Sequence, residues 1–349
     1  MKVVYLFTGY RGAHLAEVRA RKEQGNGYWG MLRLHKFGVT AEYLELEQTY
    51  LMSIARFLRR HILSVYFVHL PLYFRFFKYD IVFTSTGYGT QLVHTLLQMR
   101  KPRWVMHDFS IMGLLGKEKT LFQKVFAWMV SRCAGIVTVA KAERDALQKR
   151  FPKLHGHIVY IPYGVDLEYF RPTGIPEERE IFVPGRDPDR DYKTLFEAAK
   201  GLDAKVIVTT HKSRLDMFQP LPSFVIHKTL SVEELRESYA KASVVVLPLD
   251  ITSGLNDAMG VSALYEALAM GKAIIATRTP TMESYIESGE NGILVDEGNI
   301  EGMRQALSNV LSDTQLRTRL GKNARAYAEK NLDADVCTKN LADFFERIQ

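Results

Sequence analysis

Short apolar runs alternate with longer stretches of helical period along the whole chain. The apolar runs of the first half are Val3–Phe7, Ile81–Thr84, Trp104–Met106, Gly135–Val139 and Ile158–Ile161. Those of the second half are Glu180–Val183, Lys205–Val208, Phe224–Ile226, Ser243–Leu247, Ala273–Ala276 and Gly292–Val295. The stretches of helical period include Leu195–Lys200, Val232–Ala242 and Ala263–Met270. Alternating strands and helices predict α/β architecture, with parallel sheets covered by helices on both faces.

A Pro/Gly stretch, Arg171–Pro176, interrupts this pattern near the middle of the chain. With 349 residues the chain is too long for one comfortable core and suits two domains. We therefore expect two Rossmann-like domains, residues 1–172 and 173–330, with a ligand cleft between the carboxyl ends of their parallel sheets. Residues 331–349 have helical period and are expected to pack back on the first domain.

Composition and charge narrow the class of protein. A hydrophobic content of 47% with 24% charged residues is typical of a soluble globular chain and excludes global disorder. Residues 1–172 carry 25 Lys and Arg against 12 Asp and Glu (25 − 12 = +13), whereas the remainder carries 21 against 27 (21 − 27 = −6). This asymmetry indicates that the N-terminal half faces an anionic partner.

The compartment follows from the chain's start, its apolar runs and its cysteines. Met1–Leu6 already reads as a strand rather than a signal peptide, and no apolar run reaches the roughly 18 residues of a membrane span. Cys133 and Cys337 lie far apart without metal-ligand spacing, which favours two buried thiols in a reducing compartment. We expect a cytoplasmic protein.

Three segments give the pattern a specific meaning. They are Ile161–Pro172; Gly185–Leu195; and Gly260–Gly271, continued by Lys272–Thr277 and Glu290–Val295. Together they resemble the hinge, the donor-phosphate segment and the Glu-containing helix of glycosyltransferase family four. The resemblance implies the GT-B fold and a retaining, metal-independent hexosyltransferase. It also implies a nucleotide-diphosphate-sugar as co-substrate, with no other cofactor.

Cations follow the first strand of the second domain, as this chemistry requires. A diphosphate leaving group gains charge during transfer, and without a metal it must be stabilised by fixed cations and backbone dipoles. Arg186 comes soon after the strand Glu180–Val183 and so is expected at a carboxyl edge, where ligands bind. Where the family has a second cation, a lysine before glycine, Arg190 precedes an aspartate; Lys193 is the alternative.

A predicted helix start near Ala263 supplies further donor contacts. Gly260, Val261 and Ser262 precede it, and free N–H groups at a helix start attract anions. Ser262 also suits a purely structural role as N-cap. Glu266 resembles the family glutamate that accepts hydrogen bonds from the nucleoside ribose.

The sequence departs from the family just before this helix. A second family glutamate falls eight positions before Glu266, where this chain has Ala258. Asp257 is the nearest acid and a candidate for contact with the sugar, and the backbone of Ser253 and Gly254 is the alternative.

Two candidates lie in the first domain. His107, followed by Asp108, ends the strand-like run Trp104–Met106 and resembles the family's active-site histidine, which would face the sugar of the donor. Gly12 lies in the loop Thr8–Ala13, where glycines let the backbone approach a substrate closely. The Gly-x-x-Gly spacing lacks the dinucleotide fingerprint and argues against a nicotinamide oxidoreductase.

Residues 50–78 mix basic and aromatic side chains, which suits an interfacial segment on anionic lipid. The candidates for contact with a membrane or an acceptor are Arg56, Arg59, Arg60, Phe67 and Arg75. A helix packed on the sheet would explain part of the pattern, and nucleic-acid binding would have a similar composition. The basic excess of this half leads us to favour peripheral membrane binding without nucleic acid.

Two Asp-x-Asp pairs, Asp187 with Asp189 and Asp333 with Asp335, superficially match a metal motif. Neither has converging histidines or carboxylates nearby in sequence, so we expect no metal site. The leading hypothesis is sugar transfer to a lipid-linked or membrane-proximal glycan at the inner face of the plasma membrane. The alternatives are a nucleotide-sugar epimerase or hydrolase of the same fold, and a catalytically silent regulatory subunit.

Overall fold

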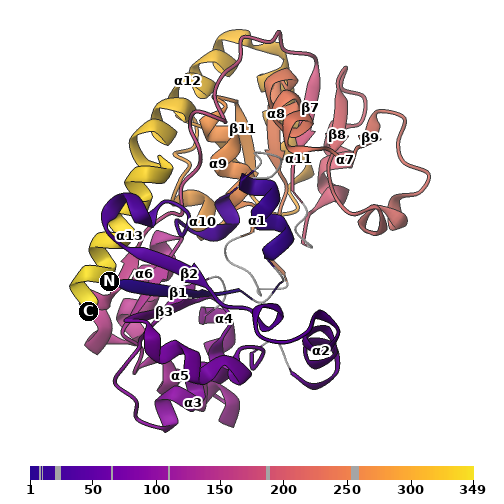
Figure 1. Ribbon diagram of the computed structural model, residues 1–349. Coiled ribbons are helices and arrows are strands. Elements are labelled where there is room, and N and C mark those ends of the chain that lie inside the picture. Colours follow the sequence, from indigo (N-terminus) through magenta and orange to yellow (C-terminus); the bar gives the residue numbers. More distant parts are fainter. Residues whose placement is uncertain are drawn as a thin grey trace. The chain divides into compact units, whose positions relative to one another are not determined.

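The computed structural model describes residues 1–7, 9, 11–19, 25–63, 66–108, 111–185, 189–252 and 259–349 (Figure 1). The chain forms two compact units, Met1–Tyr163 with Asp335–Gln349, and Gly164–Ala334. The boundary therefore follows Tyr163, not residue 172 as the Pro/Gly stretch suggested. The reason is that Val165 belongs to the second unit, where its N–H donates to the Leu332 carbonyl at 2.8 Å.

Unit 1 is built on a parallel six-stranded sheet of order β2-β1-β3-β4-β5-β6. Its strands are β1 (Lys2–Leu6), β2 (Thr40–Tyr43), β3 (Ile81–Thr84), β4 (Arg103–Asp108), β5 (Gly135–Thr138) and β6 (Ile158–Tyr160). Its α-helices are α1 (Gly12–Arg19), α2 (Met52–Phe57), α3 (Tyr88–Leu96), α4 (Ile111–Leu115), α5 (Leu121–Val130), α6 (Lys141–Arg150) and α13 (Ala334–Ile348). Shorter helical turns are η1 (Asn26–Tyr28), η2 (Leu34–Phe37), η3 (Leu46–Gln48), η4 (Leu58–Ile62), η5 (Leu70–Lys78) and η6 (Pro152–His157).

The C-terminal helix α13 closes one face of this sheet. Its buried side chains Phe344 and Phe345 join a core cluster with Tyr5 and Phe83 of the central strands. The rings of Phe83 and Phe345 meet edge to face, with centroids 5.4 Å apart. The last residues of the chain therefore complete one of the hydrophobic clusters of unit 1.

Unit 2 repeats the architecture with strand order β12-β11-β10-β7-β8-β9. Its strands are β7 (Glu180–Val183), β8 (Lys205–Val208), β9 (Val225–His227), β10 (Val244–Leu247), β11 (Ile274–Thr277) and β12 (Ile293–Val295). Its helices are α7 (Tyr192–Ala199), α8 (Val232–Lys241), α9 (Val261–Ala269), α10 (Pro280–Glu283), α11 (Ile300–Ser312) and α12 (Thr314–Asn331), with turns η7 (Lys212–Arg214) and η8 (Asp216–Phe218). The two parallel sheets confirm the predicted α/β class.

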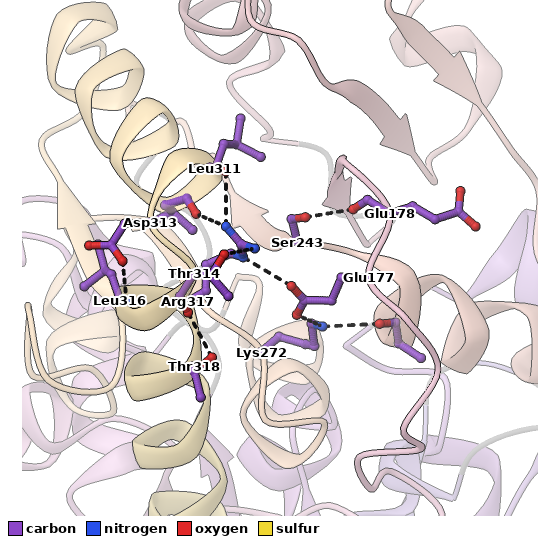
Figure 2. Close-up of polar contacts among 12 residues, drawn as sticks. Glu177, Glu178, Ser243, Lys272, Leu311, Asp313, Thr314, Leu316, Arg317 and Thr318 are labelled. Carbon is purple, nitrogen blue, oxygen red and sulfur yellow. Dashed lines mark hydrogen bonds and ion pairs between the residues drawn. The ribbon is translucent and has the colours of Figure 1, made fainter.

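The segment that leads into β7 is fixed by a cluster of ion pairs (Figure 2). The carboxylate of Glu177 accepts from the buried Lys272 ammonium at 2.7 Å and from Arg317 Nε at 3.2 Å. Lys272 also donates to the Ala240 carbonyl at 3.2 Å. Lys272 and Arg317 thus hold the segment just before β7. Among the described residues, no helix is long and apolar enough to cross a membrane.

Candidate functional site

Arg190 is fixed at the carboxyl edge of the unit 2 sheet, in the loop after β7. It forms an isolated bridge with Leu249, which follows the neighbouring strand β10. On either side of it, the N–H of Asp191 donates to Pro248 at 3.1 Å, and the N–H of Asp250 donates to the Asp189 carbonyl at 3.1 Å. Arg190 is only 7% exposed, so its cation has a fixed place next to two strand ends.

The guanidinium of Arg190 lies beside the start of α9. A Cβ added to Gly260, the residue that precedes the helix, would be 3.8 Å from Nη2 of Arg190 and 3.1 Å from Cε of Met282. Gly260 has φ +74°, a left-handed conformation that glycine adopts without strain. The missing side chain thus leaves the cation next to the first turn of the helix, whose N–H groups carry the positive end of its dipole.

Glu266, one turn into α9, completes the group. It is 5% exposed, and its Oε2 accepts a hydrogen bond from the Tyr239 hydroxyl at 2.8 Å. Burial raises the pKa of Tyr239 well above its usual range; the charge of Glu266 raises it further and that of Arg190 lowers it. Both charges therefore act on the same hydroxyl, and Arg190, Gly260 and Glu266 converge on one edge of unit 2.

The remaining donor residues differ in how the structure places them. Lys193 is exposed in the first turn of α7, so Arg190 is the cation beside α9. Val261 is buried and begins the helix, whereas Ser262 is its exposed second residue. The expectation that Ser262 is the N-cap was wrong, because Gly260 takes that position in the left-handed region.

Four candidates lie outside the described residues: Arg186, Ser253, Gly254 and Asp257. Their roles stay predictions from the sequence. Among the residues that the structure does describe, no group of three or more histidine, cysteine or acidic side chains could hold a metal ion.

In unit 1, His107 is the penultimate residue of β4 and is only 1% exposed. Its ring contacts those of Trp29 and Phe83, with centroids 4.8 and 5.2 Å away. Burial lowers the pKa of His107 to about 3, so the imidazole is neutral at physiological pH. It can form hydrogen bonds but cannot serve as a cation, and its contact with a sugar stays a prediction.

Asp108 has a local structural partner. Its side chain is fully buried at the end of β4, and Oδ1 accepts the N–H of Ile111 at 2.7 Å, where α4 begins. The carboxylate therefore links the end of β4 to the start of α4.

Gly12 is the first residue of α1, and two side chains that no sequence motif pointed to contact the backbone at Arg11 and Phe7. The N–H of Arg11 donates to Oε1 of the buried Glu45, and Nε2 of His69 lies 3.0 Å from the Phe7 carbonyl oxygen. Glu45 follows β2, a half-exposed edge strand without an apolar run. Because that strand was not predicted from the sequence, Glu45 could not be predicted to lie at a sheet edge.

The five candidates for membrane contact divide into two kinds. Arg56 and Arg60 are exposed on α2 and η4. Arg59 is instead held by Glu47 at 2.8 Å, and Arg75 donates to Oγ1 of Thr49. The half-buried Phe67 packs against α3, where a Cβ on Gly89 would lie 2.7 Å from its ring. Arg59, Arg75 and Phe67 thus have internal contacts, and contact of the five residues with a membrane or an acceptor stays a prediction.

Two protein families match separate parts of the chain. The family described as Glycosyltransferase Family 4 matches residues 37–169, and Glycosyl transferases group 1 matches residues 219–327. The second match contains the helix α9 with Glu266. The two matches together fall in both structural units.

Curated relatives show the same likeness. A D-inositol 3-phosphate glycosyltransferase of Paenarthrobacter aurescens is 26% identical over 272 residues, which cover 70% of this chain and 64% of the relative. An uncharacterized glycosyltransferase of Methanocaldococcus jannaschii is 22% identical over 281 residues, covering 77% of this chain and 76% of the relative. The chain thus spans just under two thirds of the first relative.

Solved structures share the fold along the whole chain. Sucrose-phosphate synthase from Thermosynechococcus elongatus is similar with a TM-score of 0.73 and 16% identity, covering 100% of this chain and 99% of that one. Anabaena HepE in complex with UDP-glucose is similar with a TM-score of 0.69 and 14% identity, covering 99% and 100%.

Proposed function

Since the chain belongs to glycosyltransferase family 4 of the group 1 glycosyl transferases and has the GT-B fold, we propose that it transfers a hexose from a nucleoside-diphosphate sugar with retention of configuration. One observation carries the proposal: Arg190, the start of α9 at Gly260 and Glu266 converge on one edge of unit 2. A cation, helix-start amides and a carboxylate are the groups that a diphosphate and a ribose diol require.

Each group has a part in the reaction. The bond between the sugar C1 and the β-phosphate oxygen breaks, and negative charge grows on that phosphate as a bond to the acceptor oxygen forms on the same face. Arg190 and the first N–H groups of α9 stabilise the growing charge. Glu266 accepts hydrogen bonds from the ribose, and the departing phosphate takes the proton of the acceptor hydroxyl. Arg186, from its place in the sequence, would add a second cation.

A uridine nucleotide is the donor to test first. HepE, whose chain aligns with this one along its whole length, binds UDP-glucose. The shared fold supports the use of UDP and its sugars as the first ligands in binding experiments.

The acceptor side of the proposal is a lipid-linked or membrane-proximal glycan at the inner face of the plasma membrane. Residues 48–79 contain no acidic residue but five Lys and Arg. Within them, Phe74 is 84% exposed, Ile62 61% and Phe57 55%, close in sequence to the exposed Arg56 and Arg60. Exposed aromatic and basic side chains together favour the surface of an anionic bilayer.

Replacing Arg190 tests the donor site. We expect Arg190→Gln to lower turnover of UDP-glucose by about 100-fold or more, because loss of one group that stabilises developing charge costs about 3 kcal/mol. Calorimetry with UDP and a UDP-release assay measure the effect, and NMR of the first product identifies its anomer. Lys193→Gln separates the two candidate cations, since we expect a much smaller effect at that exposed site.

The matched control is Lys205→Gln, an exposed cation at the amino end of β8. It changes the net charge of unit 2 by the same amount at the opposite edge of the sheet. Wild-type turnover in Arg190→Gln, or a product of inverted configuration, would contradict the proposal.

A further inference from the structure

Two buried side chains from distant parts of the sequence contact the backbone at the end of β1 and just before α1. Nε2 of His69 lies 3.0 Å from the carbonyl oxygen of Phe7, which follows β1. Oε1 of Glu45 accepts the N–H of Arg11, which precedes α1. Glu45 and His69 are each 1% exposed. Both contacts lie at the carboxyl end of β1, the edge at which open α/β sheets bind their ligands.

Glu45 is itself held in position. It comes just after β2, and its own N–H donates to Oε1 of Gln48 at 3.2 Å. Arg11, whose N–H donates to Glu45, immediately precedes α1, so the carboxyl group lies at the positive end of that helix. An ionised carboxylate makes a stronger hydrogen bond to such an N–H than a neutral carboxyl group does.

Charged groups surround Glu45 on each element packed against it. Glu47 on η3 repels its charge, while Arg59 on η4 and Arg11 before α1 attract it. Glu47 and Arg59 also bind each other, with Nη2 of Arg59 2.8 and 3.0 Å from the two carboxylate oxygens. Burial is the largest influence and raises the pKa of Glu45 to about 7.

The other side chain, His69, does not titrate in the same range. Burial lowers the pKa of His69 to about 4, so its ring stays neutral above pH 5. Because a neutral ring carries a proton on one nitrogen, Nε2 donates it to the Phe7 carbonyl oxygen. Near neutral pH, therefore, Glu45 changes its charge and His69 does not.

We propose that Glu45 is a positioning residue of the transfer reaction: through the N–H of Arg11 it holds the start of α1, and with it Gly12, where unit 1 contacts the substrate. This inference rests on the proposed sugar transfer. Gly12 has no side chain, so a substrate can approach the start of the helix closely. Ionisation of Glu45 strengthens its hydrogen bond to Arg11, so the start of α1 is held more firmly as the pH rises through neutrality.

Hydrogen exchange tests whether Glu45 holds the start of α1. In the full-length protein, we expect Glu45→Ala to speed exchange of the Arg11 amide by about tenfold or more, since that N–H loses its acceptor. Glu45→Gln keeps an acceptor and should show intermediate protection, with no change in protection between pH 6 and pH 8 beyond intrinsic chemistry. Glu17→Gln, an exposed acid on α1, is the control and should exchange like the wild type.

Turnover between pH 5.5 and 8.5 tests the consequence, with UDP-glucose, UDP-galactose and UDP-N-acetylglucosamine as donors. Wild-type turnover should rise through about pH 7, whereas Glu45→Gln should lose that rise and keep the wild-type affinity for UDP. An unchanged pH profile in Glu45→Gln, or wild-type exchange at Arg11 in Glu45→Ala, overturns the inference. A wild-type protein that binds no UDP instead removes the proposed function, and the positioning role with it.

Discussion

The carboxyl group of Glu45 is in a place where burial opposes its charge. A pKa raised from 4.5 to about 7 means that the folded state disfavours the ionised form by about 3 kcal/mol. Below pH 4.5 the group is protonated in the folded and the unfolded chain alike. Between pH 4.5 and 7 the unfolded chain loses its proton first, so unit 1 loses stability as the pH rises, and above pH 7 the full cost remains.

Glu45→Gln should therefore stabilise unit 1 at pH 8, by about 2 kcal/mol, while making little difference at pH 4.5. Glutamine still offers an oxygen to the N–H of Arg11 but has no charge to bury. Urea unfolding followed by tryptophan fluorescence measures this, because Trp29, Trp104 and Trp128 all belong to unit 1. A stability gain at pH 8 combined with a lost pH response of turnover would indicate that this carboxylate serves function at the expense of stability.

For single residues, the sequence predicts a place in the fold where that place follows from an adjacent strand or helix. Arg190 and Gly260 could be predicted because one follows a strand and the other precedes a helix, so chain direction alone places them at a sheet edge. His107 was predicted at a strand end, but its burial was not, because Trp29 comes from a distant turn to cover it. Glu45 and His69 act on backbone atoms far away in sequence, and no short motif records such contacts.

At the scale of elements, the segment before β7 shows how unit 2 holds its donor strand. Lys272 is 6% exposed, and Glu177 is the carboxylate that neutralises it and also contacts Arg317 of α12 (Figure 2). The neighbouring Glu178 points its carboxylate to the exterior, 3.6 Å from Lys241, with its side chain 52% exposed. Two adjacent glutamates thus form one ion pair with a buried lysine and one with a lysine at the surface.

Glu177→Ala should destabilise unit 2 by about 2 kcal/mol, because it leaves the buried ammonium of Lys272 without a counter-charge. Glu178→Ala should change stability by less than about 0.5 kcal/mol, as is usual for an exposed pair. Urea unfolding followed by far-ultraviolet circular dichroism reports both units, and tryptophan fluorescence reports unit 1 alone. Equal effects of the two substitutions would show that the Lys272 pair adds no stability.

Element prediction succeeded where burial imposed a recognisable pattern. The central strands β1, β3, β7 and β10 are buried on both faces and therefore appear as apolar runs. The edge strand β2 is only half-covered and mixes Thr40 with Glu42, so nothing in its composition distinguishes it from a loop. The start of α9 was misplaced because serine propensity at position 262 favoured a cap that the left-handed Gly260 in fact provides.

At the scale of the whole molecule, charge divides along the structural boundary. Unit 1 holds 26 Lys and Arg against 13 Asp and Glu (26 − 13 = +13), and unit 2 holds 20 against 26 (20 − 26 = −6). The surplus is therefore a property of one folded unit and can act on a charged partner as a whole. Moving the boundary from residue 172 to Tyr163, and counting the C-terminal helix with unit 1, leaves both net charges unchanged.

The proposed membrane role predicts that vesicle binding depends on the charge of the lipid. Wild-type protein should sediment with vesicles that contain anionic phosphatidylglycerol but not with pure phosphatidylcholine, and less so at high salt. Each basic residue near such a surface contributes about 1 kcal/mol, so Arg56→Gln with Arg60→Gln should weaken partitioning by about tenfold or more. Phe74→Ser should weaken partitioning at every salt concentration, because insertion of that ring is not electrostatic.

Met217→Ser, which removes a side chain that is 80% exposed on unit 2, is the matched control. If the arginine pair and Met217→Ser behave alike, the basic segment of unit 1 does not face lipid, and the acceptor must be sought among soluble glycans.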